Sequence, residues 1–266
     1  MTLSQKDLIL KKKLDYHYRF FDSSQIAPDP LEFPRRYNEP SDIEISGFVS
    51  SVFAYGNVAQ IANSLERIHQ IMGHNPTKFV LNYSFQKGLV QFGNVKHRFY
   101  TGQDIAKLFF VLSRIYRNYG SLKYFFLLYY FEKDKTLKDA ISFFSQNFMG
   151  ILSETGKLTP ALRFLLPDPF KGSACKRTNL FLRWMVRKDH LDFGLWKEIQ
   201  PAQLVIPVDT HVAKICKGLK LTRTNNVSWK MAEEITDHLR RFDSSDPVKY
   251  DFAICHIGMR KLKFWL

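Results

Sequence analysis

Residues 42–72 read DIEISGFVSSVFAYGNVAQIANSLERIHQIM and contain two consecutive stretches with a helical spacing of apolar residues. The first stretch places five apolar residues on one stripe: Ile45, Phe48, Val49, Val52 and Phe53. The second repeats the pattern with four: Ile61, Leu65, Ile68 and Met72. Apolar residues that recur three or four positions apart lie on one face of an α-helix. The segment therefore predicts two amphipathic helices in succession.

The same spacing recurs along most of the chain. It predicts further helices over residues 103–119, 122–132, 137–149, 174–187, 208–219, 229–242 and 247–261. The apolar spacing in residues 82–99 is less regular, so this segment could contain a turn or a short strand. We predict an all-α protein of about ten helices.

Composition separates classes of function only coarsely. The chain has 266 residues, 45% of them hydrophobic, which suffices for a globular core and excludes a disordered chain. Lys and Arg number 39 against 25 Asp and Glu, giving a formal net charge of +14. Such an excess points to a polyanionic partner, either nucleic acid or an anionic membrane surface. The alternative is a basic protein without such a partner.

The cysteines and the apolar runs exclude further classes. Cys175, Cys216 and Cys255 stand far apart and form no CxxC pair, so neither a disulfide framework nor a four-cysteine metal site is expected. The longest apolar run, from Phe125 to Phe131, is much shorter than the roughly 20 residues of a membrane-spanning helix. We predict a reduced, cytoplasmic protein with no protein-bound metal and no membrane partner.

One twenty-residue window, from Pro169 to Lys188, contains no acidic residue and reads PFKGSACKRTNLFLRWMVRK. On a helix that begins near Ala174, Arg183 and Arg187 each lie about 20° from Lys176 around the axis. We therefore expect a basic helix face, with Phe181, Trp184 and Met185 turned toward the core. The alternative is an ordinary solvated face.

The position of Lys176 suggests chemistry. The first turn of a helix has unpaired N–H groups and a dipole that favour anions and disfavour an ammonium group. A lysine that loses its proton easily can act as a nucleophile. The same N–H groups, after the loop that ends at Gly172 and Ser173, can hold a phosphate.

A second motif, IPVDTHV, occupies residues 206–212. Pro207 interrupts the preceding segment, and Asp209 is placed as the N-cap of a helix that begins at Thr210. An ordinary helix cap is the alternative to a functional carboxylate at this position.

These two motifs resemble the helix-hairpin-helix DNA glycosylase superfamily, which includes endonuclease III and the 8-oxoguanine glycosylases. VDTHVAKICKGLKL, residues 208–221, is the specific part. The resemblance places the catalytic Asp at Asp209 and the catalytic Lys at Lys176, with Lys171 as the alternative if the hairpin is offset. Together with SACKRTNLFLRWMVRKD, residues 173–189, the chain also resembles an uncharacterised bacterial family, domain of unknown function 2400.

The resemblance implies a fold and an activity. It implies two intimately packed helical subdomains with a cleft between them: a bundle over 42–165, and the hairpin with the Lys and Asp helices over 166–266, with 1–41 packing on either. The activity would be that of a base-excision repair glycosylase and AP lyase acting on an oxidised base such as 8-oxoguanine. A non-catalytic DNA- or RNA-binding protein on the same scaffold is the alternative, and a structural helical protein with incidental charge is a third.

The resemblance also implies partners and contacts. The partner is double-stranded DNA with a damaged base, bound by a monomer in the bacterial cytoplasm and associated with the nucleoid. No iron–sulfur cluster is expected, because the four-cysteine loop of endonuclease III is missing. The expected DNA contacts are Lys171, Gly172, Ser173, Arg177, Arg183, Arg187 and His211. The candidates for the base pocket are Phe53, Tyr55, Phe99, Phe170 and Trp196, although aromatic residues more often lie in the core.

Overall fold

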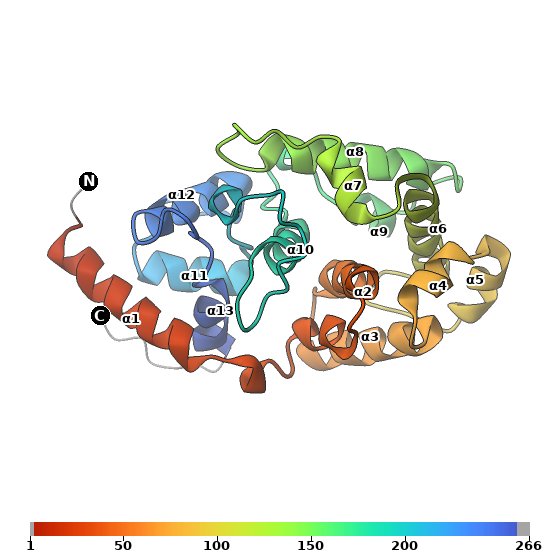
Figure 1. The fold of residues 1–266 in the computed structure, drawn as a ribbon, viewed down its shortest axis with the longest axis horizontal. Helices are drawn as coiled ribbons and strands as arrows, with labels where there is room; N and C mark the ends of the chain where they lie inside the picture. The colour runs from red at the N-terminus through yellow and green to blue at the C-terminus, as the bar shows by residue number, and fades with distance from the viewer. Residues whose placement is uncertain (1–2, 260–266) are drawn as a thin grey trace. The chain divides into compact units, whose positions relative to one another are not determined.

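The computed structural model describes residues 3–259, and α-helices form most of this part of the chain (Figure 1). The helices are α1 (Gln5–Phe20), α2 (Pro40–Phe53), α3 (Val58–Met72), α4 (Pro76–Leu81), α5 (Phe85–Gln91), α6 (Gly102–Tyr119), α7 (Leu122–Leu127), α8 (Lys138–Ser153), α9 (Pro160–Arg163), α10 (Lys176–Val186), α11 (Thr210–Gly218), α12 (Trp229–Arg240) and α13 (Asp251–Met259). Between residues 3 and 259 there is no β-strand, only two isolated bridges. The all-α prediction is confirmed.

The chain divides into two compact units, and neither is a single continuous stretch. Unit 1 comprises the described residues of 1–25, 132–138 and 169–266. Unit 2 comprises residues 26–131 and 139–168. Unit 1 therefore combines segments that lie far apart in the sequence, whereas only residues 132–138 separate the two segments of unit 2.

Unit 2 is built around α2, which is buried on every side from Asp42 to Phe53. Its predicted apolar stripe lies in the core, together with two buried acids, Asp42 and Glu44. The Glu44 carboxylate accepts hydrogen bonds from the hydroxyl of Tyr116 at 2.6 Å and from the backbone N–H of Leu122 at 2.8 Å. Because Leu122 begins α7, this acid ties three helices of the unit together.

Helix α6 begins against the backbone of another segment. Thr101 caps it, with reciprocal hydrogen bonds between Thr101 and Asp104. At the next position, Gly102, a Cβ would lie 1.9 Å from the carbonyl oxygen of Phe92. Only glycine fits there without moving the main chain.

Replacing this glycine by alanine should destabilise unit 2. We expect Gly102→Ala to lower the free energy of unfolding by about 3 kcal/mol, because a backbone carbonyl cannot move aside as a flexible side chain can. Urea unfolding followed by circular dichroism measures the change. Gly150→Ala is the matched control: a Cβ there meets nothing within 4 Å, so stability should rise by up to about 1 kcal/mol. Equal stability of the two variants would show that the close approach at Gly102 is unimportant.

Unit 1 contains α10, whose residues Phe181, Trp184 and Met185 are buried as predicted. Helix α1 is joined to this unit by hydrogen bonds to residues that lie far from it in the sequence. The hydroxyl of Tyr250 donates to Asp15 at 2.6 Å, and a guanidinium N–H of Arg241 donates to Asp7 at 2.7 Å. The N-terminal helix is therefore fixed by the C-terminal region.

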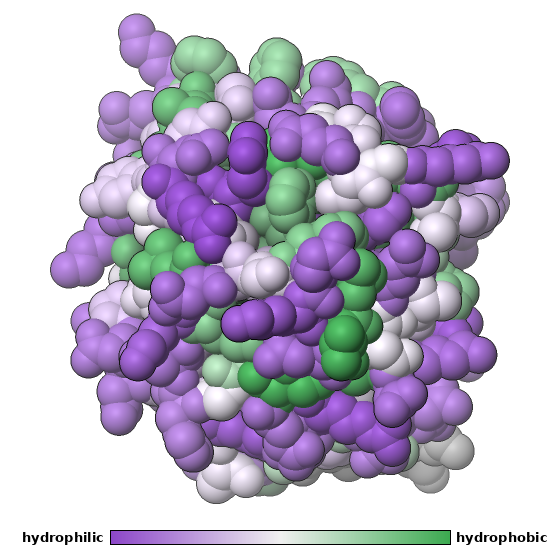
Figure 2. Space-filling view, turned by 90° about the vertical axis from the view of Figure 1, so that its right-hand side faces the viewer, coloured by the Kyte–Doolittle hydropathy of each residue, from purple (hydrophilic) through white to green (hydrophobic). Residues whose placement is uncertain are grey.

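The surface is mostly hydrophilic where Figure 2 shows it, and apolar side chains form only narrow strips between polar ones. Among the described helices, none combines the length and the apolar character needed to cross a membrane.

Candidate functional site

Unit 1 brings the side chains of Lys176 and Asp209 into direct contact. Lys176 is the first residue of α10, and Asp209 is the residue immediately before α11. The Lys176 Nζ lies 2.7 Å from the Asp209 Oδ2, although 33 positions separate the two residues in the sequence. Their side chains are 29% and 24% exposed, so the pair is neither buried nor fully solvated.

The start of α10 is shaped by Cys175, which takes the left-handed conformation at φ 46°. Ser173, two residues earlier in this loop, accepts a hydrogen bond from the Cys175 N–H at 3.2 Å through its Oγ. Residues with a Cβ rarely adopt a positive φ. This bend brings the chain into α10 with Lys176 at its first position.

Asp209 is held in one orientation. Its Oδ1 accepts hydrogen bonds from the N–H groups of His211 and Val212, both at 2.9 Å, so the predicted N-cap is confirmed. Burial favours the neutral carboxyl, but the Lys176 ammonium and these two N–H groups outweigh it and lower the pKa of Asp209. Asp209 is therefore a carboxylate at neutral pH.

This arrangement has a limited set of chemical uses. A half-exposed amine beside a fixed carboxylate can form a covalent bond to an electrophilic carbon once its proton has left. The carboxylate can accept that proton or stabilise a positive charge that develops nearby. The same contact would also serve as an ordinary ion pair that joins α10 to the start of α11.

The predicted basic face of α10 is wrong except at Lys176. Arg183 and Arg187 are each only 3% exposed, and Arg177 is 5% exposed. An Arg183 Nη lies 3.1 Å from Asp192, and the Arg187 Nε lies 2.9 Å from Asp246. These three arginines are therefore not placed to hold DNA phosphates as expected.

Arg183 and Arg187 are buried for a reason that the sequence around them does not show. Their acidic partners come from outside the acid-free window, in the loop after α10 and near the start of α13. We call this ion-pair network the arginine cluster: Arg183, Arg187, Asp189, Asp192, Asp246 and Asp251. Burial opposes the charge on Arg187, but Asp192 and its other partners outweigh it and raise the pKa of Arg187 well above its usual value. The cluster is an internal framework of unit 1.

Asp189 gives this cluster a pH dependence. Burial favours its neutral form, but Arg187 and backbone N–H groups outweigh it and lower the pKa of Asp189 to about 2. An unfolded Asp has a pKa of about 3.9, so ionised Asp189 stabilises the fold above about pH 4 and this contribution is lost as the pH falls toward 2. We expect Asp189→Asn to reduce the pH dependence of the free energy of unfolding in that window, measured by urea titration. An equally steep dependence in the variant would contradict this role.

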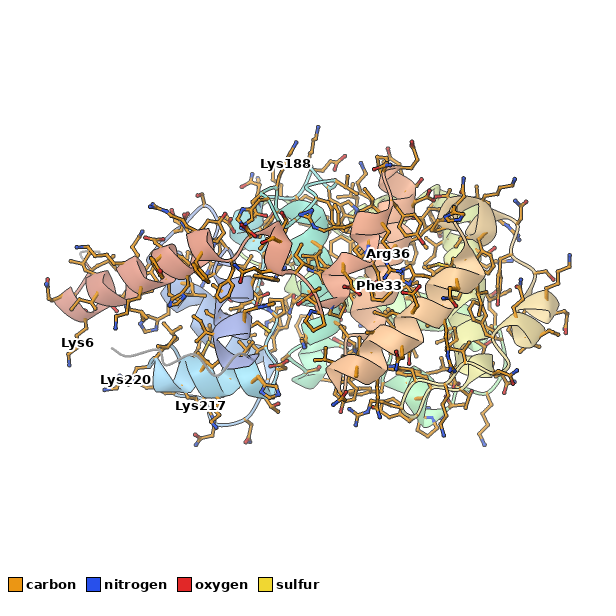
Figure 3. The ribbon with its side chains drawn as sticks, turned by 90° about the horizontal axis from the view of Figure 1, so that it is seen from below. Lys6, Phe33, Arg36, Lys188, Lys217 and Lys220 are labelled. Carbon is orange, nitrogen blue, oxygen red and sulfur yellow. The ribbon has the colours of Figure 1, made fainter. Side chains whose placement is uncertain are left out.

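The other predicted DNA contacts lie at the surface of unit 1. Lys171, Gly172 and His211 are exposed, and Ser173 is partly exposed. Gly172 takes a left-handed φ of 82°, and its carbonyl accepts a hydrogen bond from the Trp229 N–H at 3.1 Å. Lys217 and Lys220 project from the region of α11 in Figure 3. Contact of Lys171, Gly172, Ser173 and His211 with DNA stays a prediction.

The five aromatic candidates for the base pocket fall into two groups. Phe53 and Trp196 are 1% and 0% exposed, so they belong to the core and cannot stack on a base. Phe170 is 59% exposed and lies beside Lys138, whose Nζ is 4.7 Å from its ring centroid. Tyr55 and Phe99 are exposed and close together in unit 2, where Phe164 joins them.

Sequence reasoning missed Phe164 and the acids of the arginine cluster. No motif marks Phe164, and Asp192, Asp246 and Asp251 are too far apart in sequence to form one. Within residues 3–259, no group of three or more His, Cys, Asp and Glu side chains is arranged to hold a metal ion.

Comparison with known proteins gives one match. A family model described as "Protein of unknown function (DUF2400)" matches residues 29–260. No curated protein and no solved structure matches the chain. The expected relationship to the helix-hairpin-helix DNA glycosylase superfamily is therefore wrong, because the family that matches is DUF2400 and no glycosylase family does.

Proposed function

Because the chain belongs to DUF2400, a family described as being of unknown function, we propose a function from the geometry of unit 1 alone. We propose that Lys176 and Asp209 form the active site of a DNA glycosylase with AP lyase activity. The observation that supports it is the 2.7 Å contact between the amine and the carboxylate in a half-exposed position. Both groups could reach one sugar carbon without a large rearrangement.

The proposed chemistry begins with a proton transfer. The Lys176 ammonium gives a proton to water, and the free amine attacks the C1′ of a deoxyribose as the damaged base leaves and takes up a proton. The C1′–O4′ bond then breaks as O4′ takes the proton that the attached amine loses, and the opened sugar carries an iminium at C1′. At an abasic sugar, the amine adds to the C1′ aldehyde, and loss of water gives an iminium. Loss of a C2′ proton then expels the 3′ phosphate. The Asp209 carboxylate stabilises the positive charge on the sugar.

The proposed substrate is double-stranded DNA with an oxidised base such as 8-oxoguanine, which must leave the base stack before C1′ can be reached. The exposed Lys171, with the N–H groups near Gly172 and with His211, would hold neighbouring phosphates. Such a substrate would place the protein at the bacterial nucleoid. The cleft expected between two subdomains stays a prediction.

A borohydride-trapping experiment tests the proposal. The full chain is incubated with duplexes that contain an abasic site, 8-oxoguanine or undamaged guanine, with sodium borohydride present. A covalent protein–DNA adduct on a damaged duplex supports the proposal, because borohydride reduces the iminium to a stable amine. The absence of an adduct on both damaged duplexes would refute it.

A second candidate is a non-catalytic DNA- or RNA-binding protein. It is favoured by the helix-capping role of Asp209, whose oxygens already bond to Lys176 and to two backbone N–H groups. This alternative predicts salt-dependent binding that survives Lys176→Gln and Asp209→Asn, with no strand cleavage.

A further inference from the structure

Unit 2 displays two side chains at the tip of a tight turn. His97 and Tyr100 exchange backbone hydrogen bonds of 3.0 and 2.8 Å, which leaves Arg98 and Phe99 between them. The imidazole of His97 also contacts the carbonyl oxygen of Tyr55 at 3.0 Å, so the turn is fixed against the end of α2. Arg98 and Phe99 are therefore presented by a rigid support.

Phe99 belongs to a group of three exposed rings, which we call the aromatic platform: Tyr55, Phe99 and Phe164. Their side chains are 37%, 43% and 42% exposed. The ring centroid of Phe164 lies 5.6 Å from that of Tyr55 and 5.7 Å from that of Phe99. Three half-exposed rings in mutual contact offer a sequence-tolerant surface on which a flat base can stack.

A basic pocket of about 360 Å³ adjoins the aromatic platform. It is lined by Gln60, Asn63, Ser64, Arg67, Lys96 and Arg98, so no carboxylate lines it in the described part of the chain. Arg98 links the two features, because its guanidinium also lies 4.3 Å from the ring centroid of Tyr55. A guanidinium whose face rests on a ring can still donate hydrogen bonds from its edge to a phosphate.

The backbone at Arg98 is in a conformation that arginine disfavours. Its φ is 52°, in the left-handed region where glycine is the usual residue. Gly56 makes room for the side chain, since a Cβ there would lie 2.9 Å from the Arg98 Cδ. Local strain of this kind is typical of functional positions.

We propose that the aromatic platform and the basic pocket together bind single-stranded nucleic acid. A base stacks on Phe99 or on Phe164, whose ring planes meet at 70° so that one base covers only one of them, and an adjacent phosphate is held by Arg67, Lys96 and Arg98. A single strand is favoured over a duplex because the faces of paired bases are already covered. The site lies wholly within unit 2, and it does not rest on the reaction proposed for Lys176.

Fluorescence anisotropy on the full chain tests this proposal with three probes. They are a labelled thymidine 12-mer, the uridine 12-mer, and a 12-mer of abasic residues with the same backbone charge. We expect the double variant Phe99→Leu, Phe164→Leu to bind the thymidine 12-mer about tenfold more weakly. Its affinity for the abasic 12-mer should be unchanged, because leucine removes stacking and leaves the charge. The uridine 12-mer shows whether DNA or RNA is preferred.

Two controls make the test specific. Phe143→Leu removes another exposed ring of unit 2, which stacks on Tyr129, and should leave affinity unchanged. Arg67→Gln should weaken binding of all three probes, whereas Lys87→Gln, at an exposed position on α5, should weaken it much less. Equal losses for Phe143→Leu and the double variant, or wild-type affinity in the double variant, would overturn the proposal.

The variant Arg98→Gly tests binding without impairing folding. Glycine suits the positive φ, so we expect the melting temperature to stay the same or rise while affinity for the thymidine 12-mer falls about fivefold or more. Unchanged affinity in this stable variant would also overturn the proposal. Borohydride trapping is independent of these measurements, so failure of this site and failure of the Lys176 chemistry are distinguishable.

Discussion

Lys176→Gln is expected to abolish the borohydride-trapped adduct, while Lys171→Gln should still form it. Both lysines lie near the start of α10, but only Lys176 contacts Asp209, at 2.7 Å. Lys171 is exposed in the preceding loop and lacks this contact. Only an amine can form the iminium, so glutamine at the reacting position leaves no covalent product. Denaturing electrophoresis of labelled abasic duplex measures the adduct.

Lys171→Gln is also the matched control, because it removes one positive charge from the same surface. A small loss of adduct in this variant, reversed at low salt, would reflect weaker DNA binding. Asp209→Asn should slow trapping at least about a hundredfold without abolishing it, because asparagine retains the N-cap and loses the charge. Full trapping by Lys176→Gln, or its loss in Lys171→Gln alone, would assign the nucleophile to another lysine.

Among substitutions that break an ion pair, we expect Asp192→Ala to lower the free energy of unfolding most. Asp192 is fully enclosed and contacts both Arg183 and Arg187. Burial raises the pKa of Asp192, and the two arginines offset only part of the cost of ionising it. Without it, two buried guanidinium groups lose a shared partner, and we expect the free energy of unfolding to fall by about 3 kcal/mol or more.

Urea unfolding followed by tryptophan fluorescence measures this change, since Trp184 lies in the same helix as Arg183, and Arg187 directly follows that helix. Asp237→Ala is the control, because Asp237 is 48% exposed and pairs with Lys135 at 3.0 Å at the surface. A surface pair of this kind contributes less than about 1 kcal/mol. If the two variants lose equal stability, the arginine cluster is not a framework of unit 1.

The helices were largely predictable because their signal is local. Helix α3 occupies Val58–Met72, the predicted bounds, because Asn57 caps it and its apolar residues keep a strict helical spacing. Helix α1 escapes the same reasoning, since only Leu10 and Leu14 are buried within sixteen mostly polar residues. Its partners lie more than two hundred positions away, as the contacts of Asp7 and Asp15 show.

In the candidate site, too, the sequence predicted local features and missed contacts between distant residues. The motif around Asp209 predicted an N-cap correctly, because capping depends on residues within one turn. The absence of acids around Arg183 and Arg187 suggested an exposed basic face, and this was wrong because the fold supplies acids from residues 189–192 and 246–251. Charge within a sequence window says little about which charges meet in space.

The discontinuous make-up of unit 1 has a consequence for how the protein is made. During synthesis from the N-terminus, residues 26–131 and 139–168 of unit 2 are all available before any residue beyond 168 has been added. Helix α1 emerges before unit 2, yet Tyr250 and Arg241, which bond to it, emerge more than two hundred residues later. On the ribosome, unit 2 can acquire its structure while α1 has no surface to pack on. Removal of residues 237–266 should therefore leave α1 without its hydrogen bonds to Arg241 and Tyr250.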